Sequence, residues 1–325
     1  MSMSITVKKY KNNNMNDWDS FVNISISNKS IFFLRKFLSY HSNNKFSDHS
    51  LLIYNKNNLI ALLPAAVDDM RKLISHPGLS HGSFALKIGI GLEDILEIIS
   101  AVQKYIIKHR LSGLQINSQP IIYSRQHSSY LDFALLRLGF SNLCADLTNY
   151  ISIKPPEILY THYSDSCQRA IKKAKKSELD FTISDDYKGF YKILESNLMQ
   201  RHNVVPTHTI EEIGLLRDIF PDAINLFTVS YKGKIISGTI AFRVNENTQL
   251  LFYIAHDPDF QEMRPVNLLI YEVSAWCYNN KYTILDLGKF TLNGEPNYTL
   301  ARFKESFGST GTFRNKYSWE CNNEK

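Results

Sequence analysis

The stretch LFTVSYKGKIISGTIAFR (residues 226–243) contains two apolar runs on either side of a short turn, YKGK (residues 231–234). This pattern is typical of two antiparallel strands joined by a hairpin. A third apolar run follows at residues 249–256, and residues 264–278 then carry apolar side chains at helical spacing. The sequence therefore predicts a strand meander followed by a long amphipathic helix.

The same series of elements occurs twice. After the long helix, the second half predicts a strand at 282–287, a helix at 298–307 that ends at Gly308, and a strand at 312–319. The first half predicts a hairpin at 51–54 and 59–63, a long helix at 92–109, a strand at 114–117, a helix at 128–138 that ends at Gly139, and a strand at 149–153. A repeated series indicates two copies of one folding unit.

Other elements lie outside the repeat. They are a strand at 5–10, helices at 18–22 and 30–40, and helical segments at 164–177 and 187–220. The Lys-Pro-Pro step at 154–156 is the expected boundary, which gives domains 1–153 and 154–325. The expected fold class is α/β (α+β), with each domain a mixed, mostly antiparallel sheet flanked by helices.

The composition is that of an ordinary globular protein, with 44% hydrophobic and 21% charged residues among 325. No apolar run could span a bilayer, and residues 1–16 lack the apolar core of a secretory signal, so we expect a cytoplasmic protein. The four cysteines and ten histidines show no metal-ligand spacing, so no metal is expected. The net charge of +6 favours anionic ligands without requiring nucleic acid.

Several motifs occur together in the second half, with weaker counterparts in the first. They are RAIKKAKK (169–176), PTHTIEE (206–212), FP (220–221), GT (238–239) and RFKESFG (302–308), then SHPG (75–78) and PIIY (120–123). In combination they resemble the acetyltransferase-type branch of the FemABX-like family. The resemblance covers nearly the whole chain. It implies tandem GNAT-like domains and transfer of an acyl or aminoacyl group to an amine, with a degenerate, acceptor-side first domain and a donor-binding, catalytic second domain.

The donor site is expected at the start of the helix at 264–278. GNAT enzymes bind the CoA pyrophosphate on a glycine-rich turn at a helix start, and the corresponding segment here, QEMRPVN (261–267), has no glycine. Gln261, Arg264 and Asn267 are the expected contacts, because a cation and a helix start still favour an anion. A helix that merely begins with proline at its first position fits the same residues.

The basic helix offers a second candidate for the donor. Arg169 and Lys172, with Lys173 and Lys176, share one side of it, since positions three and four apart adjoin. Such a face suits the phosphates of a nucleotide or of tRNA. An ordinary solvated face is the commoner explanation of such a charge run, and no aromatic residues interleave the run to stack on bases.

Four residues are catalytic candidates. By resemblance, Lys304 contacts a phosphate or the transition state, whereas a lysine that extends along apolar surface is the structural alternative. Asp286 ends a predicted strand and Glu295 follows an Asn-Gly turn, so each is either a base or a carboxylate that binds loop N–H groups. His208 precedes the helix-capping Thr209, and histidine suits proton transfer near neutral pH.

Substrate contacts are expected in both halves. Tyr253 lies on the third strand of the meander, with His256 and Asp257 at its end, and either faces the cleft as a proton donor or belongs to the core. In the first half, His76 and Tyr123 are substrate contacts by resemblance alone. No GxSxG or Cys–His pattern indicates a covalent nucleophile, and direct amide formation requires none.

Three functions remain open. The leading one is an N-acyltransferase that moves an acyl group from acyl-CoA or a carrier to a small-molecule amine, such as an amino acid or a nucleotide-linked amino sugar in surface-polysaccharide biosynthesis. An aminoacyl-tRNA-dependent transferase is the close alternative, although the long coiled-coil insertion of some tRNA-using relatives is absent. A non-catalytic binding protein on a GNAT scaffold is the third.

Overall fold

The structure is a computed structural model that describes residues 4–24, 26–41, 45–202 and 204–321. Contacts between residues divide the chain into two units. The first comprises Met1–Leu147, Asn293–Glu295 and Thr312–Lys325, and the second comprises Thr148–Leu292 and Pro296–Gly311. Within the described ranges, every helix is too short or too polar to cross a membrane.

The second unit is built on one mixed sheet. Four antiparallel strands follow one another, β10 (Leu179–Ser184), β11 (Ile224–Tyr231), β12 (Lys234–Arg243) and β13 (Thr248–His256). β14 (Ile284–Lys289) is parallel to β13, and the end of β9 (Ser141–Ser152) is antiparallel to β14. The hairpin predicted at residues 226–243 is β11–β12.

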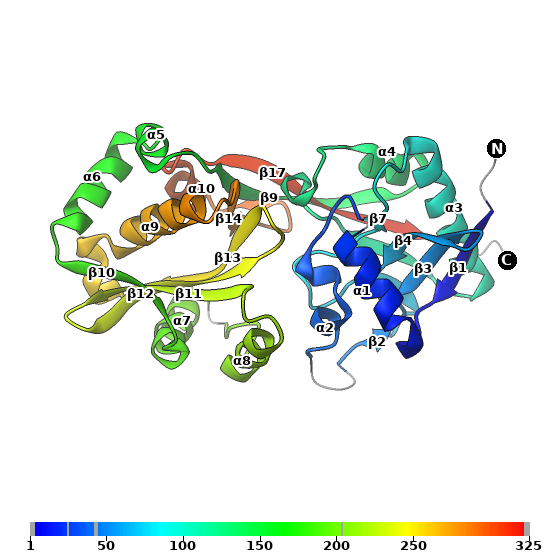
Figure 1. Cartoon of the computed structure of the whole chain (residues 1–325), viewed down its shortest axis with the longest axis horizontal. Helices are drawn as coiled ribbons and strands as arrows, with labels where there is room; N and C mark the ends of the chain where they lie inside the picture. The colour runs from blue at the N-terminus through cyan, green and yellow to red at the C-terminus, as the bar shows by residue number, and fades with distance from the viewer. Residues whose placement is uncertain (1–3, 25, 42–44, 203, 322–325) are drawn as a thin grey trace. The chain divides into compact units, whose positions relative to one another are not determined.

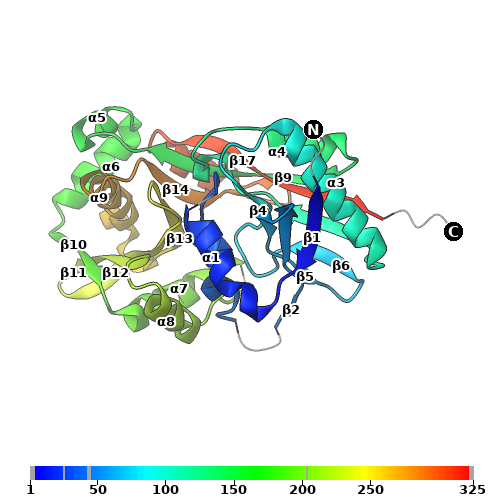
Figure 2. The same ribbon diagram turned by 45° about the vertical axis from the view of Figure 1, so that its right-hand side comes forward.

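Helices cover both faces of this sheet. α9 (Pro265–Asn279) packs on β11 and β12 with α6 (Asp165–Lys175) beside it. α7 (Tyr187–His202) packs on the opposite face, with α8 (Ile210–Ile219) against it (Figures 1 and 2). The unit also contains α5 (Pro156–Thr161) and α10 (Tyr298–Glu305). The core beneath α9 buries Phe227, Leu251, Leu269, Val273 and Leu285, and each such side chain contributes about 1.5–3 kcal/mol when it leaves water.

The first unit contains two groups of strands. One has the order β1 (Ile5–Lys9), β3 (Leu51–Asn55), β4 (Asn58–Leu63), β7 (Ala85–Leu86). The other has the order β17 (Thr310–Glu320), β8 (Gly113–Asn117), β6 (Lys72–Ser75), β5 (Ala66–Val67), β2 (Ser47–Asp48). The helices of this unit are α1 (Met15–Ile24), α2 (Arg35–Leu38), α3 (Leu92–Lys108) and α4 (Tyr130–Arg137).

Adjacent residues of β3 face two separate cores, because successive side chains of a strand point to opposite faces. Leu51 and Ile53 pack in the core that includes the apolar face of α3. Leu52, between them, packs instead with Trp18 and Phe21 of α1. This strand is therefore buried on both faces, which explains its continuous apolar sequence.

The predicted repeat is confirmed. Along the chain the hairpin β3–β4 is followed by α3, β8, α4 and β9, and the hairpin β11–β12 is followed by α9, β14, α10 and β17. Both short helices are followed by a glycine with positive φ, Gly139 at 84° and Gly308 at 66°. Glycine adopts this conformation without steric penalty, so it ends a helix at these positions.

Two predicted helices differ from the structure. Residues 30–40 form a 3-10 turn at Ile31–Phe33 and the single-turn α2, separated at Leu34, whose ψ is 138°. Phe32 and Phe33 are both buried although they are adjacent, so the segment does not keep one apolar face. Residues 187–220 form α7 and α8 rather than one segment, because Thr209 caps a new helix with its side chain; residue 203 lies outside the described residues.

The sequence did not predict the extra strands of the first unit or the full length of β9. β2, β5 and β7 have two residues each, too few to show a period. β9 begins at Ser141, eight residues before the predicted start. Residues 141–143 are exposed, so the apolar alternation that marks a half-buried strand is missing there.

The first unit should lose stability in mild acid because it buries two neutral histidines. Burial lowers the pKa of His76 to about 4 and that of His81 well below its usual value. Below pH 6.5 the unfolded chain binds protons that the folded chain does not, so stability falls as the pH falls from 6.5 towards 4. At pH 5, His76 alone should cost about 2 kcal/mol relative to pH 7.5.

Chemical denaturation at pH 7.5 and pH 5 measures this loss. The variant His81→Met removes one buried ionisable ring and should reduce the difference between the two free energies of unfolding. His127→Gln is the control, because His127 is exposed. An equal pH dependence in wild type and His81→Met would contradict the assignment of the loss to His81.

Candidate active site

A pocket opens in the second unit where β13 and β14 stop pairing. The two parallel strands are matched from Thr248–Ile284 to Leu250–Asp286. β13 nevertheless continues to His256, past a bulge opposite Ile240 and Ala241. Backbone groups of β13 beyond Leu250 therefore have no partner on β14, which leaves an open strand edge beside the start of α9.

The pocket has a volume of about 580 Å³ and combines an apolar wall with two cations. Its lining comes from the end of β13, the start of α9, β14 and α10. The lining residues are Ile254, His256, Gln261, Arg264, Pro265, Val266, Asn267, Ile270, Leu287, Asn297, Thr299, Leu300, Phe303 and Lys304. Three of the predicted donor contacts, Gln261, Arg264 and Asn267, thus meet the predicted catalytic Lys304 in one pocket.

Arg264 immediately precedes α9 and has a left-handed backbone, with φ 59° and ψ 42°. Pro265 follows at the first helical position, where its missing N–H removes no helical hydrogen bond. The Arg264 guanidinium lies 3.8 Å from the Glu262 carboxylate, and both side chains are exposed, so this ion pair restrains it little. A guanidinium and the positive end of the α9 dipole therefore act at the same side of the pocket.

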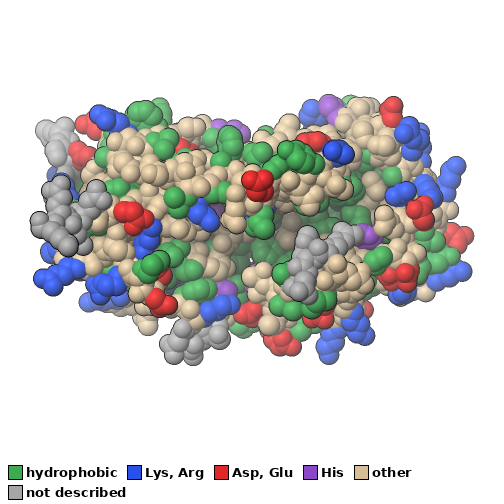
Figure 3. Space-filling model, turned by 180° about the vertical axis from the view of Figure 1, so that it is seen from behind, with side chains coloured by type: hydrophobic (Ala, Val, Ile, Leu, Met, Phe, Trp, Pro, Cys, Tyr) green, Lys and Arg blue, Asp and Glu red, His purple; other side chains and the backbone are tan. Residues whose placement is uncertain are grey.

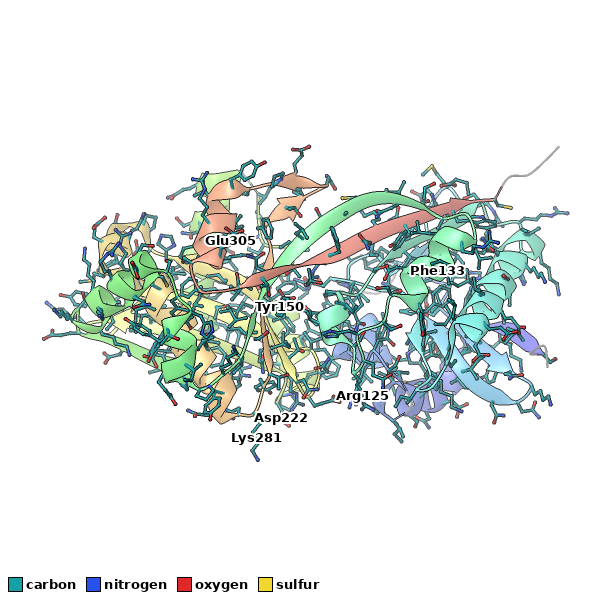
Figure 4. All side chains as sticks on the ribbon, turned by 90° about the horizontal axis from the view of Figure 1, so that it is seen from above. Arg125, Phe133, Tyr150, Asp222, Lys281 and Glu305 are labelled. Atoms are coloured by element: carbon teal, nitrogen blue, oxygen red, sulfur yellow. The ribbon has the colours of Figure 1, made fainter. Side chains whose placement is uncertain are left out.

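Lys304 is almost fully buried, with 4% of its surface exposed. Its Nζ donates to the carbonyl oxygens of Gly288 at 2.7 Å and Lys289 at 2.8 Å. The next residue, Glu305, is exposed on α10 (Figure 4). The ammonium of Lys304 is thus fixed by the last two residues of β14, which orient it where it lines the pocket.

Asp286 is fully buried and does not line the pocket. Its Oδ1 accepts hydrogen bonds from the Thr148 hydroxyl at 2.6 Å and from the Gly288 N–H at 2.7 Å. Gly288 has a φ of 78°, and its carbonyl accepts the Lys304 bond. Asp286 therefore holds the turn that carries the partner of Lys304.

His208 and Tyr253 lie together on the face of the sheet that α7 covers. The Tyr253 hydroxyl lies 3.0 Å from Nδ1 of His208 and accepts a hydrogen bond from its backbone N–H at 3.1 Å. Tyr191 of α7 in turn donates to the His208 carbonyl. Burial raises the pKa of Tyr253. Neither residue lines the pocket, which lies on the α9 side.

Three other candidates lie outside the lining. Arg169 and Lys172 are exposed on α6, the helix that packs beside α9. Glu295 is exposed on the two-residue strand β16 (Glu295–Pro296), which pairs with β15 (Thr291–Leu292). On the face that Figure 3 shows, basic and acidic side chains are interspersed over the surface.

In the first unit, both candidate substrate contacts are buried. Nδ1 of His76 lies 2.7 Å from the Pro77 carbonyl oxygen. Tyr123 has 1% exposure, and its hydroxyl accepts a hydrogen bond from Arg314 at 3.0 Å. Their side chains thus support the packing of the first unit. Among the described residues, no three histidine, cysteine or carboxylate side chains gather as metal ligands.

Sequence reasoning did not single out several lining residues, among them Leu287, Asn297, Thr299 and Phe303. One signal was available for Asn297, since asparagine is a preferred residue before a helix and its side chain accepts from the Leu300 N–H. The apolar residues carry no such signal, because their positions on β14 and α10 equally suit a core.

Comparison with known proteins agrees with this geometry. Residues 162–305 match the family described as acetyltransferase (GNAT) domain. No curated protein matches the sequence. The structure of FemX superposes with a TM-score of 0.71 at 11% identity, over 98% of each chain.

Two further solved structures share the fold. A tandem GNAT protein from the clavulanic acid biosynthesis pathway gives a TM-score of 0.56 at 9% identity, over 99% of this chain and 100% of that one. The C-terminal domain of a putative lysylphosphatidylglycerol synthetase from Agrobacterium fabrum gives 0.59 at 9% identity, over 95% and 92%. At such low identity these likenesses show the tandem fold, whereas the family match covers the part of the chain that contains the pocket.

Proposed function

We propose that this chain, whose residues 162–305 match the acetyltransferase (GNAT) domain family and whose fold is similar to that of FemX, is an N-acyltransferase that takes its acyl group from an acyl-CoA-type donor. The observation that carries the proposal is the pocket of the second unit. The unpaired edge of β13, the start of α9 and the cations Arg264 and Lys304 all lie at this pocket. An extended thioester donor can therefore contact all of them.

The pocket suits the two ends of such a donor. Phosphate oxygens are favoured beside Arg264 and the first N–H groups of α9, because the guanidinium and the helix dipole both attract anions. An amide-containing arm can hydrogen-bond to the edge of β13 beyond Leu250. Ile254, Val266 and Leu287 provide apolar contacts for its methylene groups.

The charges of the lining favour an acyl group over an aminoacyl group. Among the described residues that line the pocket there are two permanent cations, Arg264 and Lys304, and no aspartate or glutamate. An aminoacyl ester carries an ammonium group close to its reacting carbonyl, and like charges in a half-enclosed site repel. This observation supports acyl-CoA rather than aminoacyl-tRNA as the donor.

The reaction that fits the pocket is direct transfer. The nitrogen lone pair of the amine attacks the thioester carbonyl carbon, the C–S bond breaks, and the thiolate leaves and takes up a proton. We assign Lys304 to the oxyanion, because its fixed ammonium lies in a nearly water-free site. His256 lines the same pocket and is our candidate to accept the amine proton. Cys167 is excluded as a nucleophile by its burial, which raises the pKa of its thiol.

Asp286 has a positioning role in this proposal. Its carboxylate accepts a hydrogen bond from the Gly288 N–H, and the Gly288 carbonyl accepts one from Lys304. Asp286 therefore positions the ammonium through the backbone of Gly288. His208 and Tyr253 belong to the opposite face of the sheet and receive no role in the chemistry.

Donor competition tests the proposal. The purified chain should bind acetyl-CoA with a dissociation constant in the micromolar range and release free CoA when amino sugars or amino acids are added as acceptors. Calorimetry measures the binding, and a thiol reagent follows the CoA released. Transfer from charged tRNA without transfer from any acyl-CoA would overturn the choice of donor. Binding of CoA without turnover across the amine panel would favour a non-catalytic binding protein.

A further inference from the structure

The first unit contains a second pocket at the position that corresponds, in the repeat, to the donor pocket. It has a volume of about 520 Å³ and lies between β7, the start of α3, the segment after β8 and the start of α4. In the second unit the same places in the series are β13, α9, β14 and α10. A cavity therefore lies at the same point of the series in each unit, so the two linings can be compared.

The start of the long helix differs in charge between the two pockets. α9 follows Arg264 and has no acidic residue in its first turn. α3 begins instead with Glu93 and Asp94 in its first turn, and Asp94 accepts a hydrogen bond from the Gly91 N–H. These carboxylates neutralise the positive end of the α3 dipole and repel an anion. The start of α3 therefore offers a phosphate none of the attraction that Arg264 and the start of α9 provide in the second unit.

The lining of this pocket is dominated by uncharged hydrogen-bonding side chains. Hydroxyl and amide groups come from Ser27, Asn28, Ser83, Ser118, Gln119, Ser124, Gln126, Ser128, Ser129, Tyr130, Thr312 and Asn315. The charged residues of the lining are Lys87 and Asp132, and Oδ1 of Asp132 already accepts from the Tyr317 hydroxyl. A lining of this kind recognises a neutral molecule with many donors and acceptors.

Within the part of the chain that the structure describes, several of these polar side-chain atoms are buried and have no hydrogen-bond partner. They are the hydroxyl oxygens of Ser83 and Ser118 and both amide atoms of Gln119. A buried polar group without a partner is costly, and native proteins rarely leave one unless a ligand or water completes it. Four such atoms belong to residues that line one pocket, and a bound molecule towards which these side chains turn can supply the missing hydrogen bonds.

Ser83 adds an independent observation. Its side chain is buried, with 1% exposure. Its φ is 91°, a value that residues other than glycine rarely adopt. Its backbone N–H donates a hydrogen bond to the Ser75 hydroxyl at 2.5 Å, and this bond fixes the backbone conformation. Backbone strain of this kind is typical of ligand sites, where the fold holds a side chain in the geometry that binding requires.

We propose that this pocket binds an unphosphorylated sugar or a similar polyol through Ser83, Ser118 and Gln119. Vicinal hydroxyls of a sugar ring both donate and accept, which matches hydroxyl and amide side chains. Tyr130 and Phe313, both about half exposed at 51% and 59%, also line the pocket and offer aromatic faces to the apolar side of a ring. The proposal does not depend on the transfer reaction of the second unit.

Saturation-transfer NMR on the whole chain tests this site with glucose, galactose, N-acetylglucosamine and N-acetylgalactosamine as probes. At least one of them should receive saturation from the protein, and Gln119→Leu should reduce that signal at least fivefold. Ser118→Ala is a milder second variant, expected to weaken the signal while leaving thermal unfolding unchanged. Gln261→Leu removes an amide from the pocket of the second unit and should leave sugar binding as in wild type.

Three outcomes would overturn the proposal. The first is no saturation transfer to any of the four sugars. The second is transfer that persists unchanged in both Gln119→Leu and Ser118→Ala. The third is binding of acetyl-CoA that Gln119→Leu abolishes, because it would place an anionic ligand in the pocket. The proposal expects the opposite pattern, in which Gln261→Leu loses acetyl-CoA binding and Gln119→Leu keeps it. That result would assign acetyl-CoA to the pocket of the second unit.

Discussion

Lys304→Ala should lower kcat by about two to three orders of magnitude with acyl-CoA as donor. The physical reason is that the ammonium is held in a site with little access to water, where one fixed charge stabilises a developing oxyanion strongly. Donor binding should change little, because the charge that the lysine stabilises forms only as the amine attacks. Steady-state kinetics and calorimetry with CoA measure the two effects separately.

The variant also leaves two carbonyl oxygens, those of Gly288 and Lys289, without the lysine donor. Each can cost about 1–3 kcal/mol if water does not replace the lost bond, so circular dichroism at the assay temperature must show that the variant is folded. Arg302→Ala is the matched control, since Arg302 is an exposed cation on the same helix. If a folded Lys304→Ala protein turns over within a few-fold of the wild-type rate, Lys304 does not stabilise the oxyanion.

Arg264→Gly should raise KM for the donor about 10–100-fold while kcat changes little, because a charge-assisted hydrogen bond to phosphate contributes about 1.5–3 kcal/mol. Glycine is the informative replacement. The φ of 59° at this position strains an L-residue, so glycine keeps the turn and removes only the side chain. Thermal stability should therefore be equal to or above that of wild type.

Arg169→Ala serves as the comparison for Arg264→Gly. Arg169 is exposed on α6, so its loss should leave KM unchanged if the donor phosphates lie at α9. The effect of Arg264→Gly should also shrink as the salt concentration rises, since the lost interaction is electrostatic. A large rise in KM for Arg169→Ala, together with a wild-type KM for Arg264→Gly, would show that the donor phosphates bind at α6 and not at α9.

The sequence placed together those lining residues of the second-unit pocket that depend on one helix. Gln261, Arg264 and Asn267 lie within two turns, so a single helix start brings them together. Lys304 joins them through a tertiary contact, and family resemblance rather than periodicity singled it out. Gly288 and Lys289 bind Lys304 through their backbone carbonyls. Every residue has such a carbonyl, so the sequence does not indicate these partners.

The direction of each side chain on β13 could not be predicted. Strict alternation from Leu251 assigns Tyr253 to the same face, whereas the bulge after Leu251 places Ile254 and His256 on the pocket side. A bulge adds one residue and reverses the faces beyond it, and nothing in the sequence marks its position. Tyr253 therefore lies on the face opposite the pocket, and His208 lies beside it on that face.

The course of β17 has a consequence for how the chain is made. Residues from Thr312 onwards belong to the first unit, although they follow the whole second unit in the sequence, and Lys316 to Glu320 pair with β8. A nascent chain therefore leaves the ribosome with the edge of β8 uncovered until almost all of the sequence shown has been translated. During that time an unpaired strand edge invites association with other chains, so the first unit is the part of this protein that we expect chaperones to hold during synthesis.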